Sequence, residues 1–115
     1  MSCRCRPPDR HEAVRSADLI LFGVVDSVLS MSEARTLLVL HTIRSWKGSL
    51  PSTTQVNTMG TCRYVARPGE HHVLFLKKRR SGGLETSICS GNASGPEVEK
   101  VIGELDKRFD RGRLD

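Results

Sequence analysis

The sequence has 115 residues and a mass of 12.8 kDa, which is enough for a single domain over residues 1–115 and too little for two. Apolar residues make up 37% and charged residues 27%, a composition that supports a modest core and excludes a disordered chain. The net charge of +5 makes it a small basic domain, and 115 residues are too few for a large enzyme with a cofactor-binding domain. No apolar run approaches the roughly 18 residues that a membrane-spanning helix needs, so we expect no membrane span.

The N-terminal third is predicted to contain an extended segment, a short helix and a strand. Residues 3–8 cannot be helical, because two prolines fix φ and remove N–H donors. We therefore expect residues 1–8 to be an extended, disulfide-tethered segment. Asp9 then caps a helix over residues 11–16. Residues 19–29 are apolar and β-branched and predict a long strand, with Gly23 as a bend or a bulge.

The middle of the chain is predicted to be strands joined by turns. Residues 35–46 and 53–58 have strand composition, and residues 60–64 form the loop that carries Cys62. A turn at residues 67–70 precedes a strand over residues 71–78. Residues 81–83 read as a tight hairpin turn, and residues 84–89 as its return strand.

The C-terminal segment predicts a helix over residues 95–110. Ser94 and Glu97 have the spacing of a capping box. Apolar side chains at helical spacing then form a single stripe, made of Val98, Val101, Ile102, Leu105 and Phe109. We expect the tail after Phe109 to be frayed. Five or six strands with a helix at each end predict a mainly β fold, a small closed barrel, because closure removes exposed strand edges.

The four cysteines are Cys3, Cys5, Cys62 and Cys89. An even count in a small chain with few aromatic residues indicates two disulfides. Cys3 and Cys5 are poorly placed to pair, because an extended C-x-C segment points both side chains the same way about 7 Å apart. We therefore expect each N-terminal cysteine to reach separately to one of the two later cysteines.

A zinc site and four free thiols are the alternatives to disulfides. Structural zinc sites usually carry two cysteines with two to four residues between them, whereas Cys3 and Cys5 have only one residue between them. His71 and His72 are adjacent and would face opposite sides of a strand. We therefore predict no intrinsic metal and no cofactor.

Disulfides imply an oxidising compartment, so we predict a secreted, periplasmic or cell-surface protein. Met1-Ser2 has neither the charged nor the apolar region of a signal peptide. Our interpretation is that a leader has been removed and that the mature chain begins near Cys3.

No pattern in the sequence is typical of an enzyme, and we predict that the protein is not one. There is no nucleophile elbow, phosphate-binding glycine loop or helical pair of metal-binding histidines. The clearest charged cluster is Lys77-Lys78-Arg79-Arg80, which we interpret as a solvated hairpin tip that resists edge pairing. Nucleic acid is not expected as a partner, because most aromatic residues lie in apolar patterns. A polyanion, such as a sulfated glycan or a lipid headgroup, is the more natural partner.

Cys3-Arg4-Cys5-Arg6-Pro7-Pro8 resembles the C-x-C-x-P-P start of the tissue inhibitors of metalloproteinases. Later segments recur in the same order as in that family: Ala17-Asp18-Leu19, Trp46-Lys47-Gly48, Gly60-Thr61-Cys62-Arg63-Tyr64 and Thr86-Ser87-Ile88-Cys89-Ser90. The match runs from Cys3 to about Ser90. The resemblance implies a netrin-like module, which is an OB-fold barrel flanked by helices. It also implies that Cys3 pairs with Cys62 and Cys5 with Cys89.

In this family the amino group and carbonyl oxygen of the first cysteine chelate the zinc of the protease. The resemblance implies that Cys3 is this chelator, that Arg4 enters the primed-side specificity pocket, and that Cys5, Thr61 and Cys62 belong to the contact ridge. Arg4 is charged where the family usually has a small or apolar side chain. A lipid anchor on Cys3, which the sequence leaves open, would block the amine.

The resemblance therefore predicts a metalloprotease as partner. The alternative is a netrin-like module without inhibitory activity, which binds an extracellular protein or a polyanion through its basic surface.

Overall fold

The computed structural model describes residues 3–6 and 8–110. Its elements are α1 (Arg10–Ser16), β1 (Leu19–Ser32), β2 (Arg35–Lys47), β3 (Thr53–Met59), the 3-10 helix η1 (Gly60–Cys62), β4 (His71–Lys78), β5 (Leu84–Glu85), β6 (Ala93–Ser94) and α2 (Glu97–Asp110). Our expectations for the start of the mature chain and for the C-terminal tail fall on residues 1–2 and 111–115, outside the described residues. Within the described part, no helix has the length and apolarity to cross a membrane.

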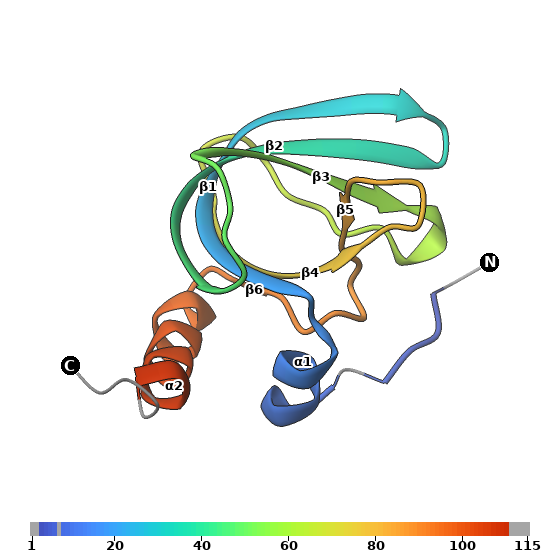
Figure 1. The fold of residues 1–115 in the computed structure, drawn as a ribbon. Coiled ribbons are helices and arrows are strands. Elements are labelled where there is room, and N and C mark those ends of the chain that lie inside the picture. Colours follow the sequence, from blue (N-terminus) through green and yellow to red (C-terminus); the bar gives the residue numbers. More distant parts are fainter. Residues whose placement is uncertain (1–2, 7, 111–115) are drawn as a thin grey trace.

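The strands close into the predicted barrel (Figure 1). Neighbours follow the order β1-β2-β3-β5-β4, and β4 then pairs back onto β1. All barrel pairs are antiparallel except β3 with β5, which is parallel. This is the topology of an OB-fold, and β6 adds a short sixth strand on the free side of β4.

A bend in β1 allows the barrel to close. The pairing of β1 with β2 shifts register between Phe22 and Gly23, which confirms the expected irregularity at this glycine. A Cβ atom at Gly23 would lie 2.6 Å from the carbonyl oxygen of His41, so only glycine allows β2 to approach this closely. Residues 19–24 pair with β4, while β1 continues past the bend with β2 into a hairpin that projects from the barrel (Figure 1).

Two apolar clusters follow from the alternation of side chains along the strands. One includes Leu21, Leu38, Leu40, Val56 and Leu74, all completely buried. The other lies between the sheet and the helices, and its members include Ala13, Ile20, Val73, Phe75, Val98, Val101 and Leu105. Both helices lie on the same side of the barrel (Figure 1). The predicted stripe of α2 is confirmed, since Ile102 and Phe109 also pack, partly buried, against this second cluster.

The helix ends differ in how well the sequence predicted them. Asp9 caps α1 as expected, because its carboxylate accepts the backbone N–H of Glu12 at 2.8 Å. In contrast, α2 begins at Glu97, not at residue 95. Ser94 belongs to β6, where it pairs with His72, and Gly95 adopts a φ of +60° in the turn that follows. Most strands run one to three residues beyond their predicted ends.

The predicted return strand over residues 84–89 is wrong, because β5 ends at Glu85. Beyond it the edge of β4 is completed by side chains until β6 begins. The backbone N–H of Phe75 donates to the side-chain oxygen of Asn92 at 2.7 Å, and the Thr86 hydroxyl donates to the Phe75 carbonyl at 3.0 Å. Asn92 also donates to the Thr86 hydroxyl at 2.8 Å. These two side chains satisfy the backbone groups that a longer strand would have paired.

Candidate functional site

Two disulfides fasten the N-terminal segment to the barrel. Cys3 is bonded to Cys62 in η1, with their Cα atoms 4.9 Å apart. Cys5 is bonded to Cys89 in the loop between β5 and β6, with a Cα separation of 5.8 Å. These pairs are the ones that the resemblance implied. Arg4 lies exposed between the two anchored cysteines.

The two disulfides lie against each other. The Cys3 Sγ atom is 4.0 Å from that of Cys5 and 3.7 Å from that of Cys89. All four sulfur atoms lie within 4.8 Å of one another. The C-x-C side chains therefore point the same way, as expected for an extended segment. Cys5 is exposed and the other three cysteines are partly buried, so the sulfur cluster lies at the surface.

The two loops that receive the disulfides are also hydrogen-bonded to each other. The Ile88 backbone N–H donates to the Cys62 carbonyl at 2.9 Å. Thr61 is exposed next to Cys62, and the apolar side chains of Val65 and Ile88 are 74% and 46% exposed. The structure thus gathers Cys3, Arg4, Cys5, Thr61, Cys62 and Cys89 into one edge. The exposed apolar neighbours of this edge were missed from the sequence.

A buried histidine holds the loop that follows Cys62. The Nδ1 atom of His72 lies 2.7 Å from the Tyr64 hydroxyl, and its Nε2 atom lies 3.2 Å from a Glu70 carboxylate oxygen. The same oxygen of Glu70 accepts the Arg67 backbone N–H at 2.8 Å. An ionised carboxylate only accepts, so Nε2 donates to Glu70; in the neutral ring, Nδ1 then accepts from Tyr64. This chain of hydrogen bonds braces residues 64–70 against β4.

Two residues of this network have shifted pKa values. Burial raises the pKa of Tyr64 to about 12; the Ser94 hydroxyl opposes this shift and the charge of Glu70 adds to it. The Arg67 backbone N–H and the His72 ring hold the pKa of Glu70 below its usual range. The sequence showed only that His71 and His72 face opposite ways, which is confirmed, since His71 is exposed and His72 is buried.

The only tyrosine in the chain gives a direct test of how deeply its hydroxyl is buried. We expect Tyr64 to ionise near pH 12 in the folded protein and near pH 10 in the unfolded chain. Because the folded pKa is the higher one, its contribution to stability is complete below pH 10 and falls as the pH rises toward 12. Tyrosinate absorbance against pH, with and without denaturant, measures both values. A folded protein that titrates near pH 10 would contradict the burial of the Tyr64 hydroxyl.

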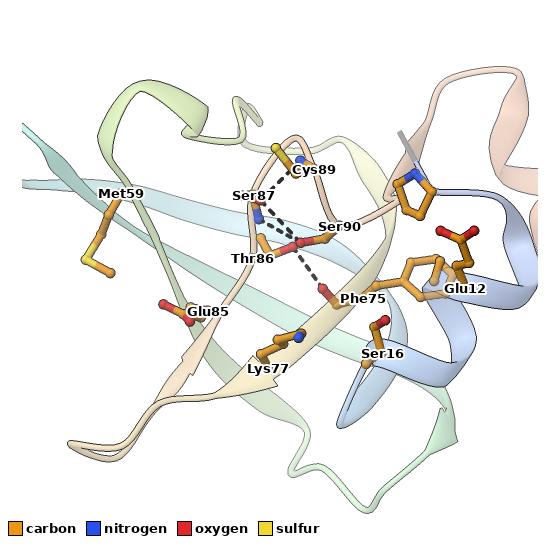
Figure 2. Close-up of a pocket in the computed structure, with 13 residues that line it drawn as sticks. Glu12, Ser16, Met59, Phe75, Lys77, Glu85, Thr86, Ser87, Cys89 and Ser90 are labelled. Atoms are coloured by element: carbon orange, nitrogen blue, oxygen red, sulfur yellow. Dashed lines mark hydrogen bonds between the residues drawn. The ribbon is translucent and has the colours of Figure 1, made fainter. Parts of the chain in front are cut away.

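A pocket of about 430 Å³ opens between α1 and the loop after β5 (Figure 2). Glu12 and Ser16 of α1 line one side, and Ser87 and Ser90 of the loop line another. Phe75 of β4 also lines it. Hydrogen bonds shape the loop wall: the Ser87 backbone N–H donates to the Ser90 hydroxyl at 3.1 Å, and the Cys89 backbone N–H to the Ser87 hydroxyl at 3.1 Å. Sequence reasoning missed this pocket, because its lining comes from segments far apart in the chain.

The predicted basic cluster lines two neighbouring hollows. Lys77 lines the pocket beside α1, and Lys78, Arg79 and Arg80 line a second, more open hollow of about 470 Å³; Met59 and Glu85 line both. Alternation along β4 turns Lys77 and Lys78 to opposite sides, and Arg79 and Arg80 follow the end of β4 at Lys78. Among the described residues, these four side chains make no ion pair. The last three therefore form an accessible cationic surface at the hairpin between β4 and β5.

No protein-family model matches the chain, and no curated protein matches it. The candidate site is therefore defined by its geometry alone. It consists of the edge that the two disulfides hold and the cationic hollow lined by Lys78, Arg79 and Arg80.

Proposed function

We propose that the protein is a secreted, periplasmic or cell-surface interaction module that binds through the edge formed by its N-terminal segment and the Cys62 loop. We propose further that it inhibits a zinc metalloprotease in the manner of the tissue inhibitors that it resembles. In this mechanism the free amine and carbonyl oxygen of Cys3 bind the zinc of the protease, and Arg4 enters the neighbouring specificity pocket.

The observation that carries this proposal is the double anchoring of the N-terminal segment. Disulfides at Cys3 and Cys5 hold the exposed Arg4 from both sides. A segment that is already ordered loses little conformational freedom on binding, so more of the contact energy becomes affinity. A neutral amine nitrogen and a carbonyl oxygen are suitable donors for zinc. Exposed Ile88, which adjoins Cys89 and donates its backbone N–H to the Cys62 carbonyl, supplies apolar contact area at the same edge.

The test compares three forms of the protein that differ only at the N-terminus. One begins at Cys3, the second is the same chain with its amine acetylated, and the third begins at Met1. We expect the first form to inhibit the catalytic domain of a zinc metalloprotease. Acetylation should weaken inhibition by about 100-fold or more, which corresponds to about 2.7 kcal/mol of lost binding. Inhibition constants measured against a panel of such proteases give the result.

Circular dichroism and intact mass would establish that all three forms are folded and disulfide-bonded. Equal inhibition by the free and the acetylated chain would contradict zinc chelation by the amine. A Cys3 chain that inhibits no protease of the panel would contradict inhibition itself.

The second candidate function is binding of a polyanion, such as a sulfated glycan, through the cationic hollow. Lys78, Arg79 and Arg80 line it without ion-pair partners among the described residues, so their charge is available to a ligand. Glu85 is an acidic lining residue of the same hollow and limits how much negative charge it accepts.

Charge reversal at the hairpin should weaken this binding. We expect the double variant Lys78→Glu/Arg80→Glu to lose about 10-fold or more in affinity for a sulfated glycan, and affinity of the unmodified protein to fall with salt, since exposed charges are screened. Lys100→Glu/Lys107→Glu, at two exposed positions of α2, makes the same change in net charge and is the matched control. Calorimetry at two salt concentrations measures both effects. An equal loss in the Lys100→Glu/Lys107→Glu variant, or affinity that salt does not change, would contradict a specific cationic site.

A further inference from the structure

The four cysteine sulfurs have nearly the arrangement that a tetrahedral metal site needs. Zinc binds thiolates at about 2.3 Å, which places neighbouring sulfurs of a tetrahedron about 3.8 Å apart. The Sγ atom of Cys3 is already 3.7 Å from that of Cys89 and 4.0 Å from that of Cys5. No two of the four sulfurs are more than 4.8 Å apart. Only the sulfurs within each disulfide need to separate, by rotation of their side chains.

We propose that reduction of both disulfides converts this cluster into a zinc site with four cysteine ligands. In the oxidised protein no described cysteine is free, so the site exists only in the reduced form. The metal would join the same partners as the disulfides. Cys3 and Cys5 supply two ligands from the N-terminal segment, and Cys62 and Cys89 supply two from the barrel.

The surroundings of the cluster favour both reduction and metal binding. Cys5 is exposed, so a dithiol reductant reaches the bridge to Cys89. Arginines adjoin three of the four cysteines in sequence: Arg4, Arg6 and Arg63. Their positive charge offsets the net charge of −2 that four thiolates and one Zn²⁺ would carry.

The reaction balances with a dithiol as reductant. Two dithiol molecules reduce the two disulfides to four thiols and are themselves oxidised to two disulfides, with transfer of four electrons and four protons. One Zn²⁺ then binds the four sulfurs and releases the four thiol protons to solvent. Two molecules of a disulfide oxidant reverse the sequence: they take four electrons from the four thiolates and four protons from solvent and are reduced to thiols, the two protein disulfides re-form and Zn²⁺ is released, so the metal content follows the redox state.

The experiment uses the full chain, reduced by a dithiol, freed of reductant without oxygen, and titrated with Co²⁺ as a spectroscopic probe. We expect one Co²⁺ per chain, with the absorption of tetrahedral thiolate coordination, and displacement of Co²⁺ by Zn²⁺. Fluorescence of Trp46, the only tryptophan, should match the oxidised protein once metal is bound. Adding a disulfide oxidant should release one Zn²⁺ per chain to a chromogenic chelator.

Two controls make the result decisive. The oxidised protein should show no thiolate coordination, and Cys3→Ser/Cys5→Ser, reduced, should bind Co²⁺ about 100-fold more weakly or not at all. A reduced chain that shows no tetrahedral thiolate absorption would overturn the proposal. It would also fail if the Cys3→Ser/Cys5→Ser variant bound as tightly as the unmodified chain, or if the metal bound without restoring the native Trp46 signal.

Discussion

Removing either disulfide is expected to lower the free energy of unfolding by about 3.6 kcal/mol, whichever of the two is chosen. The sequence separations alone, 59 residues for Cys3–Cys62 and 84 for Cys5–Cys89, correspond to about 4.3 and about 4.6 kcal/mol in the chain-entropy model. The two bridges, however, are not independent. When one bridge is already formed, forming the other closes a loop that contains the segment between Cys62 and Cys89 and the short link between Cys3 and Cys5. This loop is about 30 residues long, whichever bridge forms second.

Urea unfolding of Cys3→Ser/Cys62→Ser and of Cys5→Ser/Cys89→Ser, followed by Trp46 fluorescence, measures this prediction. The matching alanine pairs are the control for the polarity of serine. A difference of more than about 1 kcal/mol between the two variants would contradict the shared-path account. It would mean that one bridge stabilises the native state by more than its effect on the unfolded chain.

Loss of both bridges should lower the free energy of unfolding by about 8 kcal/mol. This is the sum of the full chain-entropy term of one bridge and the smaller term of about 3.6 kcal/mol for the bridge that forms second. Domains of this size have total stabilities of about 5–15 kcal/mol, so the reduced chain without metal is expected to lie near its unfolding transition. Zinc bound by the four thiolates would restore the same connections between the N-terminal segment and the barrel. The Trp46 fluorescence of the reduced chain, measured with and without zinc, therefore tests both the stability prediction and the proposed metal site.

The features that sequence reasoning predicted correctly depend on local patterns. Strand alternation, the glycine in β1 and the apolar stripe of α2 are sequence patterns that each lie within one strand or one helix. Together they predicted the closed barrel. The C-x-C spacing likewise disfavoured a bond between Cys3 and Cys5, and neither observed bridge joins these two residues. Which later cysteine joins each of them is a long-range property, and only the family resemblance indicated it.

The features that were missed arise where distant polar side chains meet. Asn92 and Thr86 complete the edge of β4, so the chain leaves the sheet at Glu85 although residues 86–89 resemble a strand. His72 finds Tyr64 and Glu70 in a loop whose path no periodic pattern indicates. Single side chains that satisfy backbone groups leave no repeat in the sequence, and their partners are known only once the fold is known.

Replacing Asn92 by alanine is expected to lower the free energy of unfolding by about 3 kcal/mol. The Asn92 side chain accepts from the buried backbone N–H of Phe75 at 2.7 Å and donates to the Ser87 carbonyl at 3.2 Å and to the Thr86 hydroxyl at 2.8 Å. Alanine leaves these groups without their partner, and each buried polar group left unsatisfied costs about 1–3 kcal/mol. Ser90→Ala is the matched control in the same loop, with an expected loss of about 1 kcal/mol or less.

Hydrogen exchange at the Phe75 amide separates this mechanism from a general loosening of the fold. In Asn92→Ala we expect hydrogen exchange to accelerate more at the Phe75 amide than at the Leu74 amide. Leu74 pairs with Leu21 in the β1–β4 ladder, which the substitution does not touch. The loop that carries Cys89 then has one fewer attachment to β4, so the disulfide to Cys5 would hold the N-terminal segment to a less rigid support. If Phe75 stays as protected in the variant as in the unmodified protein, another group has replaced the Asn92 oxygen. The side chain would then not be what completes this edge of the barrel.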